Sequence, residues 1–429
     1  MRRVTEVPPG FRPVPRTGVI YVMTEAARCG YQVGDPRWAN LGQGAPETGD
    51  LPGAPARQQE VRFAGPESFE YSPIDGLPEL RDAVAALYND RYRSGKRSKY
   101  TRENVAISPG GRAGLTRLVS TLGRTNVGHF LPDYTAYEEL LDSFGTFVPI
   151  PLIRRPEADY AFPAEELREE VLGRGLSTVV LSNPSNPTGA CIWGEELERW
   201  VAVARELRCT VVFDEFYSHY VYLDGSATVS AATYVEDVNE DPVVILDGLT
   251  KNWRYPGFRV AWTVGPRSII EAVTSAGSFL EGGCSRPMQL AALPLVERSI
   301  ADREAAAIRA VFRAKRDRML ARLTELGIRV SPPAGAFYCW GDLSQLPPPL
   351  NTGMGLFRAG LEAGLITVPG VFFDINPGRR RPERASRFHH FVRFSFGPAM
   401  AEVERGLDIL AELIQRAARG ERVIREAVR

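Results

Sequence analysis

Hydrophobic and polar positions follow two different periods through the middle of the chain. Short apolar runs bounded by glycine, proline or polar residues predict buried strands, and apolar residues three or four positions apart predict helices with one buried face. The strands are expected near residues 104–108, 127–131, 147–151, 177–182, 209–213, 243–246 and 258–264. The helices are expected near residues 111–122, 135–144, 164–172 and 195–207. This alternation predicts an α/β fold whose large domain holds a mostly parallel seven-stranded sheet flanked by helices.

The pattern changes towards both ends of the chain. Residues 1–66 are rich in proline and glycine, which predicts an N-terminal arm and loop with one short amphipathic helix near residues 19–27. The large domain is expected at residues 67–300. A long Ala-, Arg- and Glu-rich helix, short strands near residues 335–340, 365–368 and 391–396, and a closing helix then predict a smaller α+β domain at residues 301–429, on which the arm packs in part.

Composition excludes several classes of partner. The 52 basic residues balance the 52 acidic ones, so we expect neither nucleic acid nor an anionic membrane as a partner. No apolar run approaches the length of a membrane span, and the basic start lacks the apolar core of a signal peptide. The five cysteines and four histidines show no metal-binding spacing. We therefore expect a cytoplasmic protein with reduced thiols and no metal site.

Lysine is rare in this chain, and one lysine lies at a predicted ligand-binding edge. Only four of the 52 basic residues are lysines. Arginine replaces lysine on surfaces but cannot form a Schiff base, because guanidinium stays protonated and is a poor nucleophile. Lys251 follows the predicted strand at residues 243–246, where open α/β sheets bind ligands. Taken alone, this stretch is equally compatible with a solvated loop lysine.

Three other motifs follow predicted strands. The glycine turn at residues 108–113 precedes a helix whose free N–H groups could bind phosphate, although glycine turns are common. Tyr134 could stack on a flat ring or pack in the core. Residues 183–189, NPSNPTG, contain two Asn-Pro steps that favour a rigid extended loop able to hold an amide in place. A plain turn needs neither this length nor this order.

Charged residues complete the pattern. Asp214 follows the predicted strand at residues 209–213, and a buried carboxylate there needs a partner such as a protonated pyridine nitrogen. Tyr217 is close enough in sequence to reach the same ring. Arg259 is expected to start the strand after Lys251, where it could fork onto a phosphate, and a surface arginine is the alternative.

Together these motifs resemble one known family. The order NPSNPTG, DEFY, LTK and PGFR, with YSPIDG, GAFYCW and VRFSF, is similar to that of the class I and II aminotransferases, the fold type I enzymes that use pyridoxal 5′-phosphate. The match runs from about Asn40 to Arg393. The resemblance implies that the large domain binds this cofactor.

The resemblance also implies roles for residues around the cofactor ring. Lys251 forms the Schiff base with the cofactor and carries the proton. Asp214 pairs with the pyridinium nitrogen, and Tyr217 and Asn186 hold the phenolic oxygen. Tyr134 stacks on the ring.

Further implied roles concern the phosphate and the assembly. Gly111, Arg112 and Arg259 hold the phosphate, with Thr250 as a helper. Tyr71 reaches the phosphate of the neighbouring subunit, which implies a homodimer with shared active sites.

The implied substrate is an amino acid. Arg393 binds its α-carboxylate, with Gly44 and Asn186 close by. Two positions depart from the family pattern: Gly248 stands where many relatives have serine, and Arg112 stands where a small or amide residue is usual. No counterpart of the family's helper arginine for acidic side chains can be placed. Arg286 lies in a suitable region but in an unfamiliar context.

Three functions remain open from the sequence. The first is an aminotransferase acting on an α-amino acid through Lys251. The second is a relative that performs elimination, replacement or cyclisation at Cβ or Cγ in specialised biosynthesis, for example on S-adenosylmethionine, because PGFR also resembles the aminocyclopropane-carboxylate synthases. The third is a non-catalytic cofactor-binding module, which the retained lysine disfavours. The basic segment at residues 378–387 is expected to be a solvated surface insertion rather than an anion site.

Overall fold

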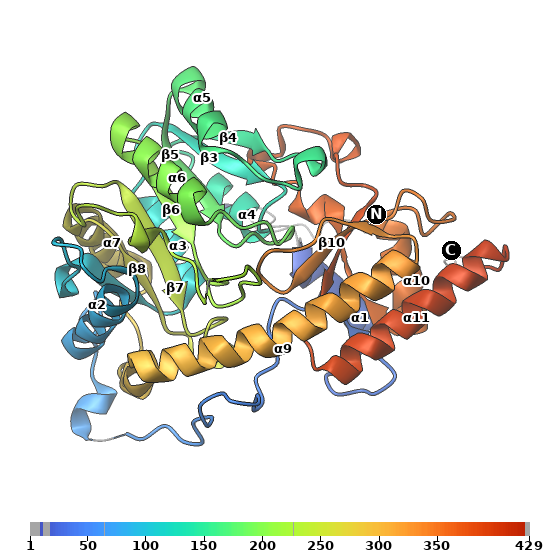
Figure 1. Cartoon of the computed structure of the whole chain (residues 1–429), viewed down its shortest axis with the longest axis horizontal. Coiled ribbons are helices and arrows are strands. Elements are labelled where there is room, and N and C mark those ends of the chain that lie inside the picture. The colour runs from blue at the N-terminus through green and yellow to red at the C-terminus, as the bar shows by residue number, and fades with distance from the viewer. Residues whose placement is uncertain (1–8, 12–17, 64, 226, 425–429) are drawn as a thin grey trace.

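A seven-stranded sheet forms the centre of the larger domain in the computed structural model, which describes residues 9–11, 18–63, 65–225 and 227–424 (Figure 1). Its order is β2-β8-β7-β6-β5-β3-β4. The strands are β2 (Val105–Ser108), β3 (Asn126–Leu131), β4 (Val148–Ile153), β5 (Leu176–Ser182), β6 (Thr210–Asp214), β7 (Val243–Gly248) and β8 (Ala261–Val264). All neighbours are parallel except β8, which is antiparallel to β2 and β7. The predicted mostly parallel sheet is confirmed.

Helices cover both faces of this sheet, and the strand residues alternate between them. The helices of this domain are α2 (Pro78–Tyr92), α3 (Gly111–Ser120), α4 (Ala136–Ser143), α5 (Ala164–Arg174), α6 (Gly194–Leu207), α7 (Arg267–Leu280) and α8 (Arg286–Ala292). On β6, Val211 and Phe213 join the core formed with α2, α5 and α6, whereas Val212 joins the core formed with α3, α4 and α7. Two buried faces explain why consecutive residues in the middle of β6 are apolar.

Local signals set where several helices begin and end. Pro78 starts α2, where its fixed φ suits the first turn and its missing N–H has no helical partner to lose. Gly364 ends α10 (Gly353–Ala363) with φ 88°, a left-handed conformation that glycine adopts at little cost. At the other end of α10, the Thr352 hydroxyl accepts the N–H of Gly355 at 3.1 Å.

The smaller domain is built on a four-stranded antiparallel sheet of order β12-β13-β10-β9. Its strands are β9 (Arg329–Val330), β10 (Tyr338–Asp342), β12 (Val368–Pro369) and β13 (Phe391–Ser395). The long helix α9 (Arg298–Glu325) runs from the larger domain to the smaller one and lies beside α11 (Met400–Ala418) (Figure 1). The expected domain boundary at residue 300 falls inside α9 and stays a prediction.

Two sequence-based expectations need correction. The single strand expected near residues 365–368 is two strands in different sheets, because β11 (Leu365–Ile366) pairs with β1 (Ala39–Asn40) and β12 pairs with β13. Arg259 does not start β8: it follows a short 3₁₀ turn, η5 (Pro256–Phe258), and has a left-handed φ of 53°. A local pattern of apolar residues does not reveal such a turn.

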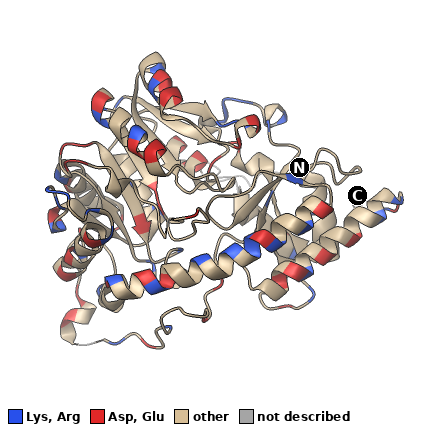
Figure 2. Cartoon of the chain, in the orientation of Figure 1, with Lys and Arg blue, Asp and Glu red and all other residues tan. Residues whose placement is uncertain are grey.

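The N-terminal arm joins the smaller domain. Helix α1 (Gly18–Arg28) contacts β12, and the Tyr21 ring lies 5.4 Å from that of Phe372. The first part of the expected arm falls largely outside the described residues. Basic and acidic residues are interspersed along the helices, most visibly along α9 (Figure 2). In the described ranges, no helix is long and apolar enough to cross a membrane, and no cluster could hold a metal ion.

Candidate active site

A cavity of about 610 Å³ lies where the carboxyl ends of the central strands meet the smaller domain. Ser182 ends β5 and Asp214 ends β6, while Tyr338 and Arg393 enter from β10 and β13. Residues after parallel strands meet at one edge of the sheet, which explains why motifs far apart in sequence converge here. Of the twelve predicted site residues, the cavity is lined by Gly44, Gly111, Arg112, Tyr134, Asn186, Asp214, Tyr217, Thr250, Lys251, Arg259 and Arg393.

Lys251 lies in the turn after β7 and points into this cavity, where its Nζ donates to the carbonyl oxygen of Gly44. Burial and, after it, the nearby guanidinium groups of Arg393, Arg112 and Arg259 together lower the pKa of this amine to about 7, against the opposing effect of Asp214. An amine with this pKa is partly unprotonated at neutral pH. It can therefore act as a nucleophile or a base.

Asp214 is the buried carboxylate of the site. The hydroxyl of Tyr137 donates to its Oδ2 at 3.1 Å, and the N–H of Phe216 donates to its Oδ1 at 3.4 Å. Burial raises the pKa of Asp214 to about 6, and its hydrogen bonds and Lys251 oppose this. A cationic ring nitrogen beside it would stabilise the charged form.

Arg393 and two tyrosines form the wall on the side of the smaller domain. Arg393 is 1% exposed, and it donates from Nη1 to Asn186 Oδ1 at 3.0 Å and from Nη2 to the Gly42 carbonyl at 2.8 Å. Its guanidinium carbon lies 4.2 Å from the centre of the Tyr338 ring. The Tyr338 hydroxyl lies 3.0 Å from that of Tyr217. Arg393 is thereby held in one orientation at the cavity surface.

The side of the cavity formed by the larger domain can bind an anion at the start of α3. The turn before α3 needs glycine at Gly110, where φ is 91° and a side chain would collide with Arg259, and at Gly111, where a Cβ would lie 2.5 Å from the Phe216 ring. The first N–H groups of α3 have no helical acceptor. Arg112 donates from Nε to the Tyr134 hydroxyl at 3.2 Å.

The residues present fit pyridoxal phosphate. Three arginines face the cavity with neutral oxygens as their hydrogen-bond partners, which leaves their charges available to a phosphate and a carboxylate. In the described part of the chain, Thr250 Oγ1 and Arg393 Nε are buried without a hydrogen-bond partner. Asp214 suits a protonated ring nitrogen, and Tyr134 offers an aromatic face.

Sequence reasoning missed three residues of this region, namely Tyr137, Ser182 and Tyr338. Tyr338 belongs to the GAFYCW motif, but four consecutive buried residues of β10 do not show which side chain faces a cavity. Tyr137 and Ser182 lie beside predicted residues and act through hydrogen bonds to them. The sequence signal that could have identified Tyr137 and Ser182 is their nearness in the chain to Tyr134 and Asn186.

Two residues considered from the sequence lie outside the cavity. Tyr71 is 92% exposed and does not line it. Two other exposed aromatic residues, Phe63 and Phe69, stack on each other nearby in sequence with ring centres 5.6 Å apart. Arg286 begins α8 and does not line the cavity either, and its Nε is buried without a hydrogen-bond partner in the described part of the chain.

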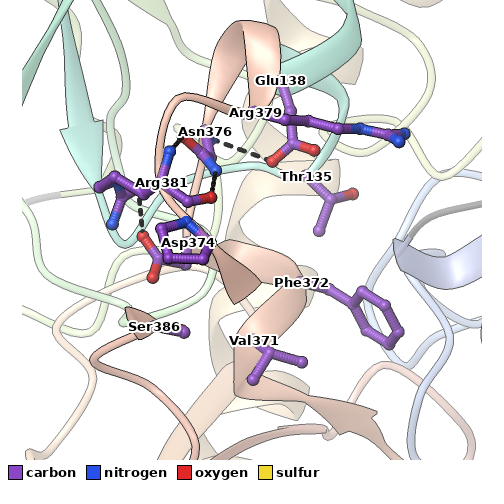
Figure 3. A pocket seen from close by; sticks show the side chains of 10 residues that line it. Thr135, Glu138, Val371, Phe372, Asp374, Asn376, Arg379, Arg381 and Ser386 are labelled. Atoms are coloured by element: carbon purple, nitrogen blue, oxygen red, sulfur yellow. Dashed lines mark hydrogen bonds and ion pairs between the residues drawn. The ribbon is translucent and has the colours of Figure 1, made fainter. Parts of the chain in front are cut away.

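The basic segment at residues 378–387 is mostly exposed, but part of it folds back onto α4 (Figure 3). Arg381 donates to Asp374 at 2.6 Å, and the N–H of Asn376 donates to Glu138 of α4 at 3.0 Å. With Thr135, these residues line a second cavity of about 450 Å³. Arg379 and Arg381 also pair with the carboxylates of Glu139 and Asp374, which lie outside the segment, so the segment differs from a fully solvated insertion.

Comparison with known proteins agrees with this geometry. The family model for aminotransferase class I and II matches residues 36–410. The aspartate/prephenate aminotransferase of Thermus thermophilus is 27% identical over 81% of this chain and 84% of its own length. A probable N-succinyldiaminopimelate aminotransferase of Mycobacterium tuberculosis is 28% identical over 87% of this chain and 92% of its own.

Solved structures show the same fold. A tetra mutant of Thermus thermophilus aspartate aminotransferase complexed with tryptophan superimposes with a TM-score of 0.76 at 25% identity, covering 94% of this chain and 97% of that one. An aminotransferase from Mycobacterium tuberculosis gives a TM-score of 0.77 at 24% identity with the same coverage. The chain therefore belongs to the class I and II aminotransferases and is a pyridoxal-phosphate-dependent transferase of fold type I.

Proposed function

We propose that this cavity transfers the amino group of an α-amino acid to a keto acid, with Lys251 as the residue that attaches the cofactor and moves the proton. One observation carries the proposal: the buried amine of Lys251, whose pKa is lowered to about 7, lines the same cavity as Asp214 and Arg393. The bound cofactor supplies an aldehyde carbon for an amine to attack and a ring that accepts the electron pair released when the Cα–H bond breaks.

Four residues would hold the cofactor ring. The Asp214 carboxylate would accept a hydrogen bond from the N–H of the ring, and its negative charge would keep that nitrogen protonated. Tyr217 and Asn186 donate hydrogen bonds to the phenolic oxygen. Tyr134 covers one face of the ring. Because these groups come from the ends of different strands, the sheet sets their relative positions.

The phosphate would bind at the start of α3. The backbone N–H groups of Gly111 and Arg112 and the hydroxyl of Thr250 donate to its oxygens, and the guanidinium groups of Arg112 and Arg259 balance its charge. The hydroxyl of Thr250 is buried and has no partner in the described part of the chain, which supports this role.

The substrate carboxylate would bind to Arg393, near Gly44 and Asn186. A guanidinium held by Asn186 and the Gly42 carbonyl presents its remaining N–H groups in a fixed direction, which orients the Cα–H bond of the substrate. Lys251, as a neutral amine, would take the Cα proton of the substrate. The atom to which its ammonium group then gives that proton would decide between transamination and elimination.

We also propose a homodimer with shared active sites, working in the cytoplasm. Phe63, Phe69 and Tyr71 are 62%, 78% and 92% exposed, and such an apolar surface favours a protein partner. Tyr71 would donate to the phosphate bound by the neighbouring subunit. The five cysteines are free thiols, which agrees with a reducing compartment.

A spectroscopic test addresses the reaction. The purified protein is loaded with pyridoxal phosphate, titrated with a panel of amino acids, and monitored by its visible spectrum and by analysis of the products. We expect a keto acid and stoichiometric pyridoxamine phosphate. Release of a leaving group or ammonia without pyridoxamine phosphate would contradict transamination. Borohydride reduction followed by peptide mapping should label Lys251, and a label elsewhere would refute its role.

A further inference from the structure

A buried carboxylate behind the cavity connects three of its walls. Asp133 is 0% exposed and lies between the end of β3 and Tyr134. Its Oδ1 accepts the N–H of Tyr134 at 2.8 Å and the hydroxyl of Ser182 at 2.9 Å. Its own N–H donates to the carbonyl of Phe373 at 3.2 Å. Asp133 does not line the cavity, but each of its partners contacts or lines the site.

The bond to Ser182 continues towards the substrate arginine. The Ser182 Oγ accepts the N–H of Asn186 at 3.0 Å, and Asn186 Oδ1 accepts Nη1 of Arg393 at 3.0 Å. The backbone N–H of Asn186 and the guanidinium of Arg393 can only donate, so the Ser182 hydroxyl is the one group in this chain whose proton could point elsewhere. Asp133 Oδ1 accepts that proton and thereby sets the orientation of the hydroxyl.

The bond to Phe373 reaches the same arginine from the other side. Phe373 belongs to the 3₁₀ turn η7 (Gly370–Phe373), and its ring centre lies 5.1 Å from the guanidinium carbon of Arg393. Asp133 thus links the larger domain to a segment of the smaller domain that covers Arg393. Both the orientation and the packing of Arg393 depend on groups bonded to Asp133.

A buried arginine, Arg154, acts on the charge of this carboxylate without a hydrogen bond to it. Arg154, at the end of β4, is 3% exposed, and its guanidinium carbon lies 4.4 Å from the centre of the Phe130 ring. Burial raises the pKa of Asp133 to about 7, and Arg154 is the first of the groups that oppose this increase. A buried charge without a compensating charge is costly, so Arg154 favours the acceptor form of Asp133.

We propose that Asp133 is a positioning residue that sets the orientation of Tyr134, Asn186 and Arg393. This inference rests on the function proposed above. Asp133 does not touch the cofactor or the substrate. It supplies the acceptor that holds the ring-stacking tyrosine and the end of a hydrogen-bonded chain leading to the substrate carboxylate.

Three variants separate the acceptor from the charge. Asp133→Ala removes the acceptor, Ser182→Ala breaks the chain, and Asp133→Asn keeps an oxygen at Oδ1 while removing the charge. We expect the first two to raise both the KM for the amino acid and the dissociation constant of pyridoxal phosphate about 10- to 100-fold, as loss of supporting contacts does at other sites. Asp133→Asn should keep both constants within about threefold of wild type, because its oxygen still serves both donors. Its thermal stability should fall, because the buried charge of Arg154 loses its nearby opposite charge.

The matched control is Asp241→Asn. Asp241 is 3% exposed, pairs with Arg205 and accepts the N–H of Glu236, but it lies away from the cavity. Thermal unfolding, binding of pyridoxal phosphate to the apoprotein followed by tryptophan fluorescence, and visible circular dichroism of the bound cofactor are measured for every variant. The dichroism band reports ring orientation, which loss of stability alone does not alter.

The possible results are distinct. An altered dichroism band and raised constants in Asp133→Ala and Ser182→Ala, with the band and both constants unchanged in Asp133→Asn and Asp241→Asn, support the proposal. Asp133→Ala matching Asp241→Asn in all four readouts overturns it, as does Asp133→Asn failing as severely as Asp133→Ala. If wild type itself shows no cofactor band or turnover, the proposed function fails instead.

Discussion

The hydroxyl groups of Tyr217 and Tyr338 lie 3.0 Å apart, although 121 positions separate the two residues in the chain. Tyr217 follows β6 of the larger domain, and Tyr338 begins β10 of the smaller domain. The bond therefore crosses the domain boundary inside the active site. The bond orients Tyr217, which is proposed to hold the phenolic oxygen of the cofactor. It does so close to Arg393, which is proposed to bind the substrate.

Tyr338→Phe tests the importance of this bond. Loss of one hydrogen bond costs about 1 kcal/mol, so kcat/KM should fall roughly fivefold while the fold is kept. Steady-state kinetics measures the change. Tyr222→Phe is the control, because the Tyr222 hydroxyl donates to the Ala336 carbonyl at 2.7 Å in the same aromatic region but does not line the cavity. Equal kinetic losses in both variants would argue against a role for Tyr338 in the site.

Lys251→Met should change how the apoprotein's stability depends on pH. The pKa of the Lys251 amine is lowered from 10.5 to about 7 in the folded chain. Between these values the unfolded chain binds more protons, so this amine makes the free energy of unfolding rise with pH, by up to about 1.4 kcal/mol per unit. Urea unfolding at pH 7 and pH 9 should show this increment in wild type and not in the variant. An identical pH response in both proteins would disprove it.

Arg393→Lys should weaken substrate binding far more than cofactor binding. Lysine keeps the charge but cannot form two parallel bonds to a carboxylate, and it loses the bonds to Asn186 and Gly42. We expect the KM for the amino acid to rise about 100-fold and pyridoxal phosphate affinity to change by less than about threefold. Parallel losses in both quantities would show that Arg393 does not bind the substrate carboxylate.

A mixture of two inactive variants tests the shared site. Lys251→Ala and Tyr71→Ala are each expected to have little activity. In a hybrid dimer, one site combines an intact Lys251 with an intact Tyr71 from the other subunit. Refolding equal amounts together should therefore restore roughly a quarter of wild-type activity by random pairing. Activity that stays at the sum of the separate variants would rule out sharing through Tyr71.

The large domain could be predicted from sequence because its signals are local. Apolar runs and the spacing of apolar residues reflect the two faces of β6 and β7 and the helices between them. Lys251, Asp214 and Asn186 were identifiable because each follows a strand, and parallel strands end at one edge. Arg259 was misplaced at the start of β8, since the left-handed turn that precedes this strand has no apolar signature.

The sequence by itself determined the family, the cofactor and most of the side chains that line the cavity, because those depend on residue type at the ends of successive strands. Only the tertiary structure decided which buried groups hold them. Asp133 meets Ser182 across 49 positions, and Arg393 meets Asn186 across 207. Such bonds depend on where distant segments pack and on which single donor or acceptor each atom still has free, and neither is expressed in a local pattern.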